Sequence, residues 1–369
     1  MSDRTYHIFL ALVGAGLWER DVLLSHYGII NWIDVYRLSS EQSVTGIVLV
    51  GIEHSDVKPP QELLLKWIGE TQLIENRNRA MNSYVADLIE QLRKEEIYAL
   101  LVKGQGVAQC YERPLWRACG DVDLLLSEDN YNKAKSFLLQ LANSNEEEAI
   151  HARHLAMTID SWVVELHGTL RSCYLKKMDR TIDEVQNDVF FSGDVRSWQN
   201  GQTQVFLPSY NSDVFFVFTH IIKHFFREGV GLRQICDWCR LLWTSKDSLN
   251  VDLLQQRIKC SGTMSEWKAF ASYAVNYLGM PIESMPLYSS ERKWLRKARR
   301  INAYIMSVGN FGHNREIIYK ESNYLVRKLK AFKRRIRDAV NHLMIFPLDT
   351  ITVFYRVLQL GIKGVFKGK

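Results

Sequence analysis

Three acidic residues stand at spacings that could bring their carboxylates together. Asp121 and Asp123 lie two residues apart in the apolar segment 121–126. In a strand, alternate side chains share a face, so both carboxylates would project together with Cα atoms roughly 6–7 Å apart, opposite Val122 and Leu124. Neighbouring carboxylates repel each other unless a cation lies between them. Because Mg²⁺ prefers oxygen ligands, the pair predicts a metal site. The same Asp-x-Asp sequence could also be two solvated acids at the end of a strand, and the tripeptide alone leaves both interpretations open.

A second apolar segment, 162–167, carries the third carboxylate, Glu165. His167 would share its face and either support the metal ligands or be an ordinary strand histidine. A glutamate buried among apolar residues costs free energy unless it is paired or binds a metal. We therefore predict that Asp121, Asp123 and Glu165 bind Mg²⁺ or Mn²⁺. Two such ions about 3.5–4 Å apart could hold the attacking and leaving oxygens of a phosphoryl or nucleotidyl transfer.

Residues that could hold phosphate precede the aspartates. The apolar segment 97–102 reads as a buried strand that ends at Lys103 and Gly104, followed by Gln105. Backbone N–H groups and an ammonium at this turn could hold a triphosphate. Arg117 stands four residues before the aspartates. It could reach phosphate or brace the loop, and the sequence leaves both readings open.

The elements that must position these residues predict an α+β fold in three parts. Residues 1–95 show mostly helical periodicity, with a polar stretch at 75–79 that could separate two helices. Residues 96–206 read as strand, helix, strand, helix and a hairpin turning at 160–161, which implies a small mixed sheet with helices on one face. Residues 207–369 return to helical periodicity and end in a basic tail.

These segments together resemble the polymerase-beta-like nucleotidyltransferase superfamily. More narrowly, they resemble a bacterial family of uncharacterised nucleotidyltransferases with the pattern Lys-Gly, then Arg-x-x-Gly-Asp-hydrophobic-Asp, then Glu-Leu-His. The matching residues are 103–104, 117–123 and 165–167. The resemblance covers most of residues 1–250 and the remainder more weakly.

The resemblance implies transfer of a nucleoside monophosphate from a nucleoside triphosphate to an acceptor hydroxyl on a small molecule, a glycan precursor or a protein. Asp121 and Asp123 would bind both metal ions, and Glu165 would be a third ligand and a candidate base. The turn departs from the superfamily, where glycine is followed by serine or glycine. Here Gln105 follows Gly104, which bears on triphosphate binding more than on metal binding.

Bulk composition fits a globular protein and restricts its partners only loosely. Of 369 residues, 47% are apolar and 24% are charged, unlike a disordered chain. The net charge of +6 favours anionic ligands such as nucleotides, nucleic acid or an acidic membrane. The six cysteines show no disulfide spacing, no signal-peptide pattern is visible, and the apolar run 8–17 is too short to span a bilayer. We expect a cytoplasmic protein.

A basic amphipathic helix is predicted near the C-terminus. Its apolar stripe is formed by Leu325, Leu329, Phe332, Ile336 and Val340. The helix and the later segment 353–366 could lie on an anionic membrane. The helix could also bind nucleic acid, or pack against the domain with a solvated basic face.

Two histidine and cysteine pairs, His220-x-x-x-His224 and Cys236-x-x-Cys239, superficially resemble a zinc arrangement. Both pairs fall within apolar helical patterns, so we favour packing, with the histidines near the cleft. We expect His154 to lie at the surface.

Two other functions share some of these features. A metal-dependent glycosyltransferase also uses Asp-x-Asp, but the helical first 95 residues do not resemble the nucleotide-binding alternation of strands and helices that would precede it. A non-catalytic protein of the same fold would bind metal and nucleotide without turnover.

Overall fold

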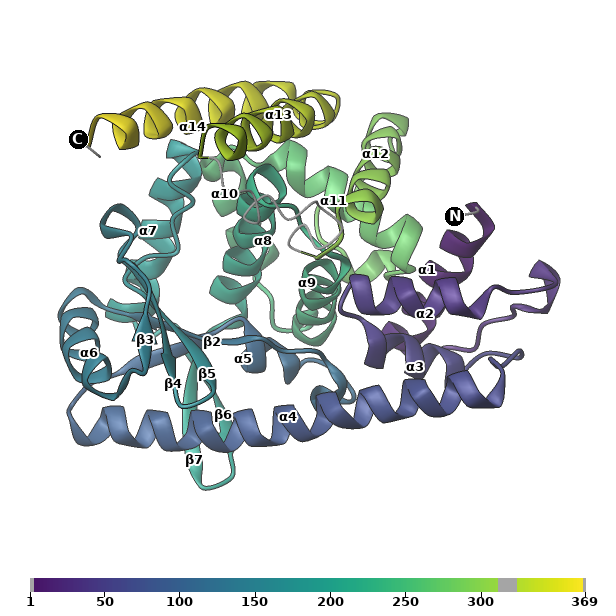
Figure 1. Cartoon of the computed structure of the whole chain (residues 1–369), viewed down its shortest axis with the longest axis horizontal. Coiled ribbons are helices and arrows are strands. Elements are labelled where there is room, and N and C mark those ends of the chain that lie inside the picture. Colours follow the sequence, from purple (N-terminus) through teal and green to yellow (C-terminus); the bar gives the residue numbers. More distant parts are fainter. Residues whose placement is uncertain (1–2, 311–323, 368–369) are drawn as a thin grey trace.

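The computed structural model describes residues 3–310 and 324–367. The fold is α+β, as predicted: a mixed five-stranded sheet lies among helices (Figure 1). The division of the chain at residues 95 and 206 stays a prediction. The N-terminal and C-terminal helices contribute to one continuous apolar core. The sheet contributes to a second core.

Four helices form the N-terminal part: α1 (Asp3–Trp18), α2 (Trp32–Glu41), α3 (Thr45–Glu53) and α4 (Gln61–Lys94). Helix α4 is continuous where the polar stretch had suggested a break. Two of its polar residues, Glu75 and Asn78, contact the loop before the aspartates. Glu75 accepts a hydrogen bond from Trp116 Nε1 at 2.8 Å, and Asn78 Nδ2 donates to the carbonyl of Arg117 at 2.8 Å. The stretch therefore fixes the loop to the helix.

The sheet has the order β1-β2-β5-β4-β3, with only β2 and β5 parallel. Its strands are β1 (Ala99–Val102), β2 (Asp121–Leu126), β3 (Ser144–Asn145), β4 (His154–Ile159) and β5 (Trp162–His167). The short α5 (Gly104–Ala108) follows β1, and α6 (Glu128–Leu141) follows β2. The apolar sheet face packs on α4 and α6, with Val122, Leu124, Val164 and Leu166 buried against Val85 and Leu138, among others. The opposite face carries the carboxylates.

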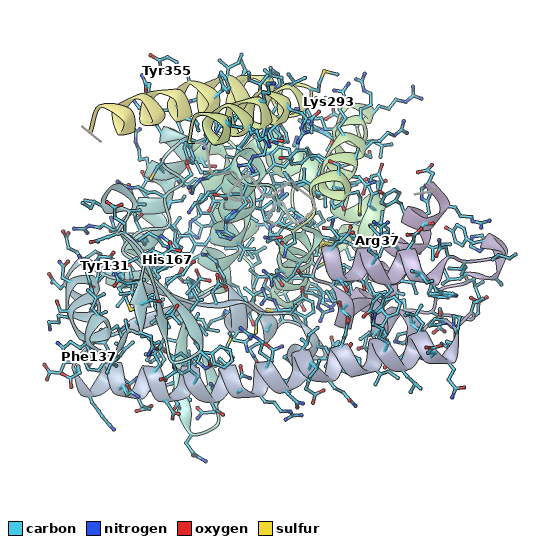
Figure 2. The ribbon with its side chains drawn as sticks, viewed as in Figure 1. Arg37, Tyr131, Phe137, His167, Lys293 and Tyr355 are labelled. Atoms are coloured by element: carbon cyan, nitrogen blue, oxygen red, sulfur yellow. The ribbon has the colours of Figure 1, made fainter. Side chains whose placement is uncertain are left out.

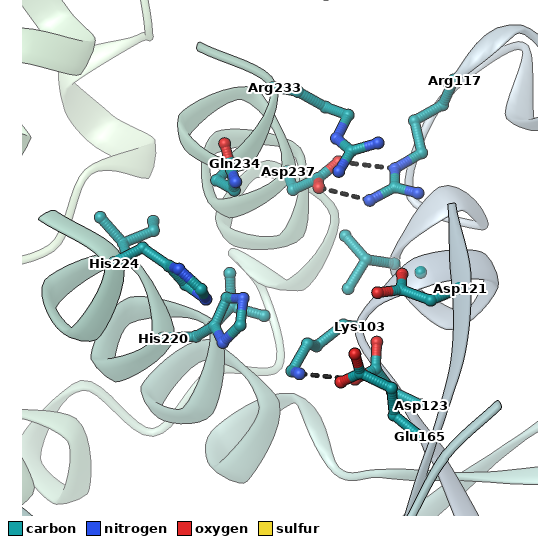
Figure 3. A pocket seen from close by; sticks show the side chains of 14 residues that line it. Lys103, Arg117, Asp121, Asp123, Glu165, His220, His224, Arg233, Gln234 and Asp237 are labelled. Atoms are coloured by element: carbon teal, nitrogen blue, oxygen red, sulfur yellow. Dashed lines mark hydrogen bonds and ion pairs between the residues drawn. The ribbon is translucent and has the colours of Figure 1, made fainter. Parts of the chain in front are cut away.

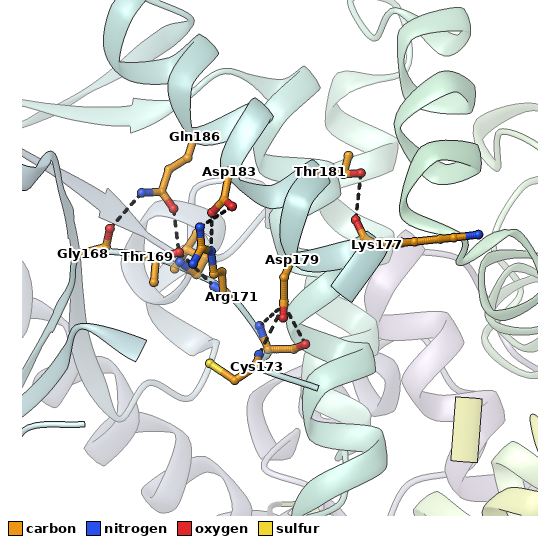
Figure 4. A network of polar contacts seen from close by, with 11 residues as sticks. Gly168, Thr169, Arg171, Cys173, Lys177, Asp179, Thr181, Asp183 and Gln186 are labelled. Carbon is orange, nitrogen blue, oxygen red and sulfur yellow. Dashed lines mark hydrogen bonds and ion pairs between the residues drawn. The ribbon is translucent and has the colours of Figure 1, made fainter. Parts of the chain in front are cut away.

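Helix α7 (Lys176–Phe191) and the hairpin β6 (Val195–Asn200) and β7 (Thr203–Pro208) were not predicted. Helix α7 holds the segment that follows β5 through a polar network (Figure 4). Gln186 Nε2 donates to the Gly168 carbonyl at 3.0 Å, and Arg171 Nε donates to Asp183 at 2.6 Å. These contacts fix the end of the strand that carries Glu165.

The C-terminal helices enclose large aromatic side chains, among them Phe218, Trp238, Trp267 and Phe270. These helices are α8 (Tyr210–Arg227), α9 (Leu232–Ser245), α10 (Val251–Ser261), α11 (Met264–Leu278), α12 (Arg292–Val308), α13 (Tyr324–Leu343) and α14 (Pro347–Lys367). Short 3-10 helices occupy Ser25–Tyr27, Pro114–Trp116, Ile150–Ala152 and Ile282–Ser284. Among the described residues, no helix combines the length and apolar character needed to cross a bilayer.

Candidate active site

The sheet brings the three predicted carboxylates together on its polar face. Asp123 stands beside Glu165 in the register of the parallel strands β2 and β5. One oxygen from each of Asp121, Asp123 and Glu165 lies within 4.8 Å of the others. Asp123 is buried, whereas Asp121 and Glu165 are half-buried. The arrangement provides three oxygen ligands for a hard cation.

The electrostatics of the cluster indicate a deficit of positive charge. Repulsion from Asp123, together with burial and Glu165, raises the pKa of Asp121 to about 6. Burial opposes ionisation of Glu165, but hydrogen bonds from His154 and His167 hold its pKa well below its ordinary value. Glu165 is therefore ionised at neutral pH, and a divalent ion would relieve the repulsion that Asp121 experiences.

Lys103 lies beside the carboxylates at the end of β1. Its Nζ atom is 2.6 Å from Asp123 Oδ1. Burial disfavours the ammonium, but Asp123 and Glu165 outweigh it and raise the pKa of Lys103. Its backbone φ of 57° lies in the left-handed region, which costs about 1–3 kcal/mol for a side chain of this kind. Gly104 follows with φ of 34°, and a Cβ there would lie 3.4 Å from the Asp121 carbonyl.

Gln105 and Arg117 are both held by other parts of the protein. The Gln105 amide is buried and donates to Asn82 Oδ1 at 2.6 Å, so it fixes α5 to α4 and does not line the cavity described below. Arg117 does line that cavity, but its guanidinium forms a two-point ion pair with Asp237, at 3.0 and 2.6 Å. Of the two readings left open for Arg117, these contacts favour bracing.

Two histidines contact the carboxylates. His167 Nε2 is 2.7 Å from Asp123 Oδ1 and 3.4 Å from Glu165 Oε2. His154, which we expected at the surface, is half-buried, with Nε2 3.0 Å from the same Glu165 oxygen. The expectation did not include this contact, although the basis for it is visible in the sequence. Counting outward from the correctly predicted hairpin turn pairs His154 with His167 across the two strands.

Helices α8 and α9 form the wall opposite the sheet (Figure 3). His220 and His224 stand one turn apart on α8, and Arg233 stands at the start of α9. Arg233 Nη1 donates to the Ala118 carbonyl at 2.9 Å, whereas its buried Nε has no partner within the described residues. Sequence reasoning did not assign Arg233 a role. Arg233 and Asp237 belong to the helical segments that resemble the family, and their spacing of four residues places both on one side of the helix.

The possible zinc arrangement does not form. Cys236 and Cys239 are buried in the apolar core, and neither belongs to a metal-capable group found in the described part of the chain. The packing prediction for the pair therefore holds. His220 lies in the cavity wall, where burial and the neighbouring charge of Lys103 lower its pKa well below the ordinary value. It is a neutral hydrogen-bonding group at neutral pH.

The two walls enclose a cavity of about 150 Å³. The sheet wall presents the three carboxylates and Lys103, and the helical wall presents His220, His224, Arg233 and Gln234. Carboxylates that could bind a cation thus lie on one side of the cavity, and cationic and hydrogen-bonding side chains lie on the other. This is the arrangement expected for a ligand that carries phosphate and is bound together with a metal ion.

Comparison with curated proteins and with solved structures found no match. Comparison with protein families found one, described as uncharacterised nucleotidyltransferase, which matches residues 29–279. That range extends from just before α2 to the end of α11 and contains the whole sheet and every residue that lines the cavity. It is more than half of the chain, and the chain therefore belongs to the uncharacterised nucleotidyltransferase family.

Proposed function

We propose that this protein transfers a nucleoside monophosphate from a nucleoside triphosphate to an acceptor hydroxyl, using Mg²⁺ or Mn²⁺ bound by Asp121, Asp123 and Glu165. One observation carries the proposal. The three carboxylates converge on a cavity whose lining also includes three basic side chains, Lys103, Arg117 and Arg233, of which Arg117 is ion-paired with Asp237. Membership of a nucleotidyltransferase family supports the reaction class.

The donor set fits a hard divalent cation. It consists of three carboxylates, and their mutual repulsion already raises the pKa of Asp121 to about 6. Ions of this kind, when bound, neutralise phosphate charge and activate the acceptor oxygen. Two ligands, Asp123 and Glu165, hold fixed positions because they pair in register on adjacent strands. The third, Asp121, stands at the start of β2 and is in register with Val163 of β5.

In the proposed step, the acceptor oxygen attacks the α-phosphorus of the triphosphate. The new phosphorus–oxygen bond forms as the bond to the β-phosphate breaks, pyrophosphate leaves, and the hydroxyl proton passes to solvent. Arg233 and Lys103 offset the charge of the triphosphate. Glu165 suits the role of ligand rather than base, because its pKa lies well below its ordinary value.

The test combines nucleotide binding with turnover. Thermal stability is measured with each nucleoside triphosphate, with and without Mg²⁺, and labelled triphosphates are then incubated with cell extract to detect a labelled product and pyrophosphate. We expect metal-dependent stabilisation and product formation, both lost in Asp121→Ala and retained in the control Asp129→Asn, an exposed acid of α6. Stabilisation without turnover would indicate a non-catalytic binder, and stabilisation only by nucleotide sugars would indicate glycosyl transfer.

We further infer that the C-terminal helices rest on an anionic membrane surface. The predicted apolar stripe is exposed where its side chains are described: Ile336 is 43% exposed and Val340 54%. Leu325, Leu329 and Phe332 lie outside the described side chains. On α14, Leu348, Ile351 and Tyr355 are exposed, and Figure 2 shows Tyr355 on the outer side of that helix. These apolar groups favour a lipid surface over nucleic acid, because lipid can bury them.

Basic side chains surround this apolar surface. Lys333, Arg335 and Arg337 are exposed on α13. Arg300 of α12 donates to the Met344 carbonyl, which places the basic face of α12 beside the turn between α13 and α14. Anionic lipid would attract these charges by about 1 kcal/mol for each residue near the surface.

Vesicle sedimentation tests this inference with matched variants. Leu348→Ser/Ile351→Ser removes two exposed apolar side chains from α14. The control, Leu65→Ser/Leu73→Ser, removes two from α4, on the opposite side of the molecule (Figure 1). We expect binding to phosphatidylserine vesicles, sensitive to salt and weakened only by the α14 pair. Equal behaviour of both variants, or binding to nucleic acid instead, would contradict it.

A further inference from the structure

A second metal-capable group adjoins the three carboxylates and shares Glu165 with them. It consists of His154, Glu165 and His167, whose ligand atoms lie within 4.8 Å of one another. The Nε2 atoms of both histidines point at the same Glu165 oxygen, at 3.0 and 3.4 Å. The two imidazole centroids are 4.8 Å apart, with ring planes inclined by 35°. Two nitrogen ligands and one oxygen ligand therefore converge on one point.

The backbone fixes this convergence. His154 and His167 are direct partners across the antiparallel strands β4 and β5, and Glu165 lies two residues from His167 on the same face. Ala156, the partner of Glu165, leaves room beside the carboxylate because its side chain is a single methyl group. The three ligands thus come from neighbouring positions in a regular hairpin, and no loop has to move to assemble them.

We propose that His154, Glu165 and His167 bind a divalent transition-metal ion of the Zn²⁺ and Co²⁺ class. Imidazole nitrogen suits these ions, whereas Mg²⁺ requires oxygen ligands. Two histidines and one carboxylate are a set that zinc accepts with a fourth position left open. The side chain of His154 is 30% exposed and so gives the ion a path from solvent.

The fourth position has two candidates, a water molecule or Asp123. The Oδ1 atom of Asp123 lies 2.7 Å from His167 Nε2 and is close enough to complete the set after a small shift. Glu165 belongs to both groups, so an ion here would lie next to the ion that Asp121 and Asp123 share. The assignment does not rest on the proposed reaction, in which neither His154 nor His167 is given a step.

Each group has two residues that the other lacks, because the two share only Glu165, and this makes the test selective. Asp121 belongs only to the oxygen group and His154 only to the nitrogen group. The full-length protein, stripped with chelator, is titrated with Co²⁺ while its visible absorption is recorded, and Zn²⁺ is then added as competitor. The variants are His154→Ala, Asp121→Ala and, as a control, His26→Ala, which changes an exposed histidine far along the chain.

We expect Co²⁺ to give an absorption spectrum of mixed nitrogen and oxygen coordination that Zn²⁺ abolishes. His154→Ala should weaken the Co²⁺ binding that gives this spectrum by about tenfold or more, whereas Asp121→Ala and His26→Ala should retain the nitrogen-coordinated spectrum. Asp121→Ala should at the same time lose Mg²⁺-dependent stabilisation by triphosphate, so the two proposals fail separately. Equal Co²⁺ affinity and identical spectra for the native chain and His154→Ala would overturn the assignment and leave the histidines as hydrogen-bonding supports. Circular dichroism of each variant verifies the fold.

Discussion

The two walls of the cavity differ in how their residues are positioned. On the sheet wall, Asp121, Asp123 and Glu165 sit on adjacent strands, and each side chain is held by hydrogen bonds or by strong electrostatic coupling. On the helical wall, His220 and Arg233 stand on separate helices, and the Nε of Arg233 is buried without a partner in the described residues. The sheet wall is suited to hold ions in a fixed geometry. The helical wall offers groups that are still available to a ligand.

The largest effect should come from the most constrained residue of the sheet wall. Asp123→Asn keeps the size of the side chain but removes the charge that contacts both Lys103 and His167. We expect nucleotidyl transfer to fall about a thousandfold, or roughly 4 kcal/mol in activation free energy, because a metal ligand is lost. Steady-state pyrophosphate release measures it, with Asp129→Asn as control. Activity within a few fold of the native chain would show that Asp123 is structural.

A buried carboxyl outside the cavity lining sharpens the contrast, because there burial outweighs the charge of the nearby Lys297. Glu266 on α11 is buried, and its two oxygens have no hydrogen-bond donor in the described residues. Burial, followed by the nearby Asp349, raises the pKa of Glu266 from 4.5 to about 9. The folded state therefore binds a proton that the unfolded state releases, and this contribution to stability is lost as pH rises from about 4.5 to 9.

Glu266→Gln removes this titration while keeping the shape of the side chain. Relative to the native chain, the variant should gain about 2–3 kcal/mol of unfolding free energy between pH 6 and pH 8, at about 1.4 kcal/mol per pH unit. Urea unfolding at both pH values measures the gain. Parallel pH dependence of the two proteins would show that Glu266 is ionised in the folded state. Glu266 would then be ionised like Glu165, and the contrast between this buried carboxyl and those of the sheet wall would no longer hold.

The sequence was informative for the sheet wall and silent for most of the helical wall, for a physical reason. Strand alternation is a local rule, so the sequence placed Asp121 and Asp123 on one face of their strand and Glu165 opposite the apolar Val164 and Leu166. The parallel pairing of β2 with β5, which sets Asp123 beside Glu165, is not local. The approach of α8 and α9 depends on aromatic packing between distant segments. Nothing local to Arg233 says which surface its helix will face.

Helix α7 was missed although its local signal is clear: its buried apolar residues, Met178, Ile182, Val185 and Val189, recur at helical spacing. The β6–β7 hairpin gave a weaker signal. The hairpin strands alternate polar and apolar residues in a sequence rich in glutamine, asparagine and glycine, and β6 lacks a strongly apolar face. Its pairing is stabilised where Val205 and Leu207 of β7 enter the core of the sheet. Such tertiary stabilisation outweighs a weak local signal.

On the helical wall, Arg233 should affect nucleotide binding more than the chemical step. Arg233→Gln removes a cation of the cavity lining whose Nε has no hydrogen-bond partner in the described part of the chain. We expect the KM for triphosphate to rise about tenfold, roughly 1.4 kcal/mol, with a smaller change in kcat. Arg233→Lys should recover part of the loss. Arg180→Gln, an exposed change on α7, is the control. A loss confined to kcat would place Arg233 with the reacting atoms instead.

The smallest effect should come from His220, and its pH dependence is more informative than its size. Burial and the charge of Lys103 keep the pKa of this imidazole well below the ordinary value, so it does not gain a proton near neutral pH. His220→Ala should therefore raise the KM for triphosphate only about two- to fivefold, by loss of one hydrogen-bonding group. It should leave the shape of the pH–rate profile between pH 6 and 8 unchanged. If the variant instead loses one limb of that profile, His220 exchanges a proton during the reaction. The two walls would then share the chemistry, and the distinction between an ion-holding sheet and a ligand-binding helical wall would fail.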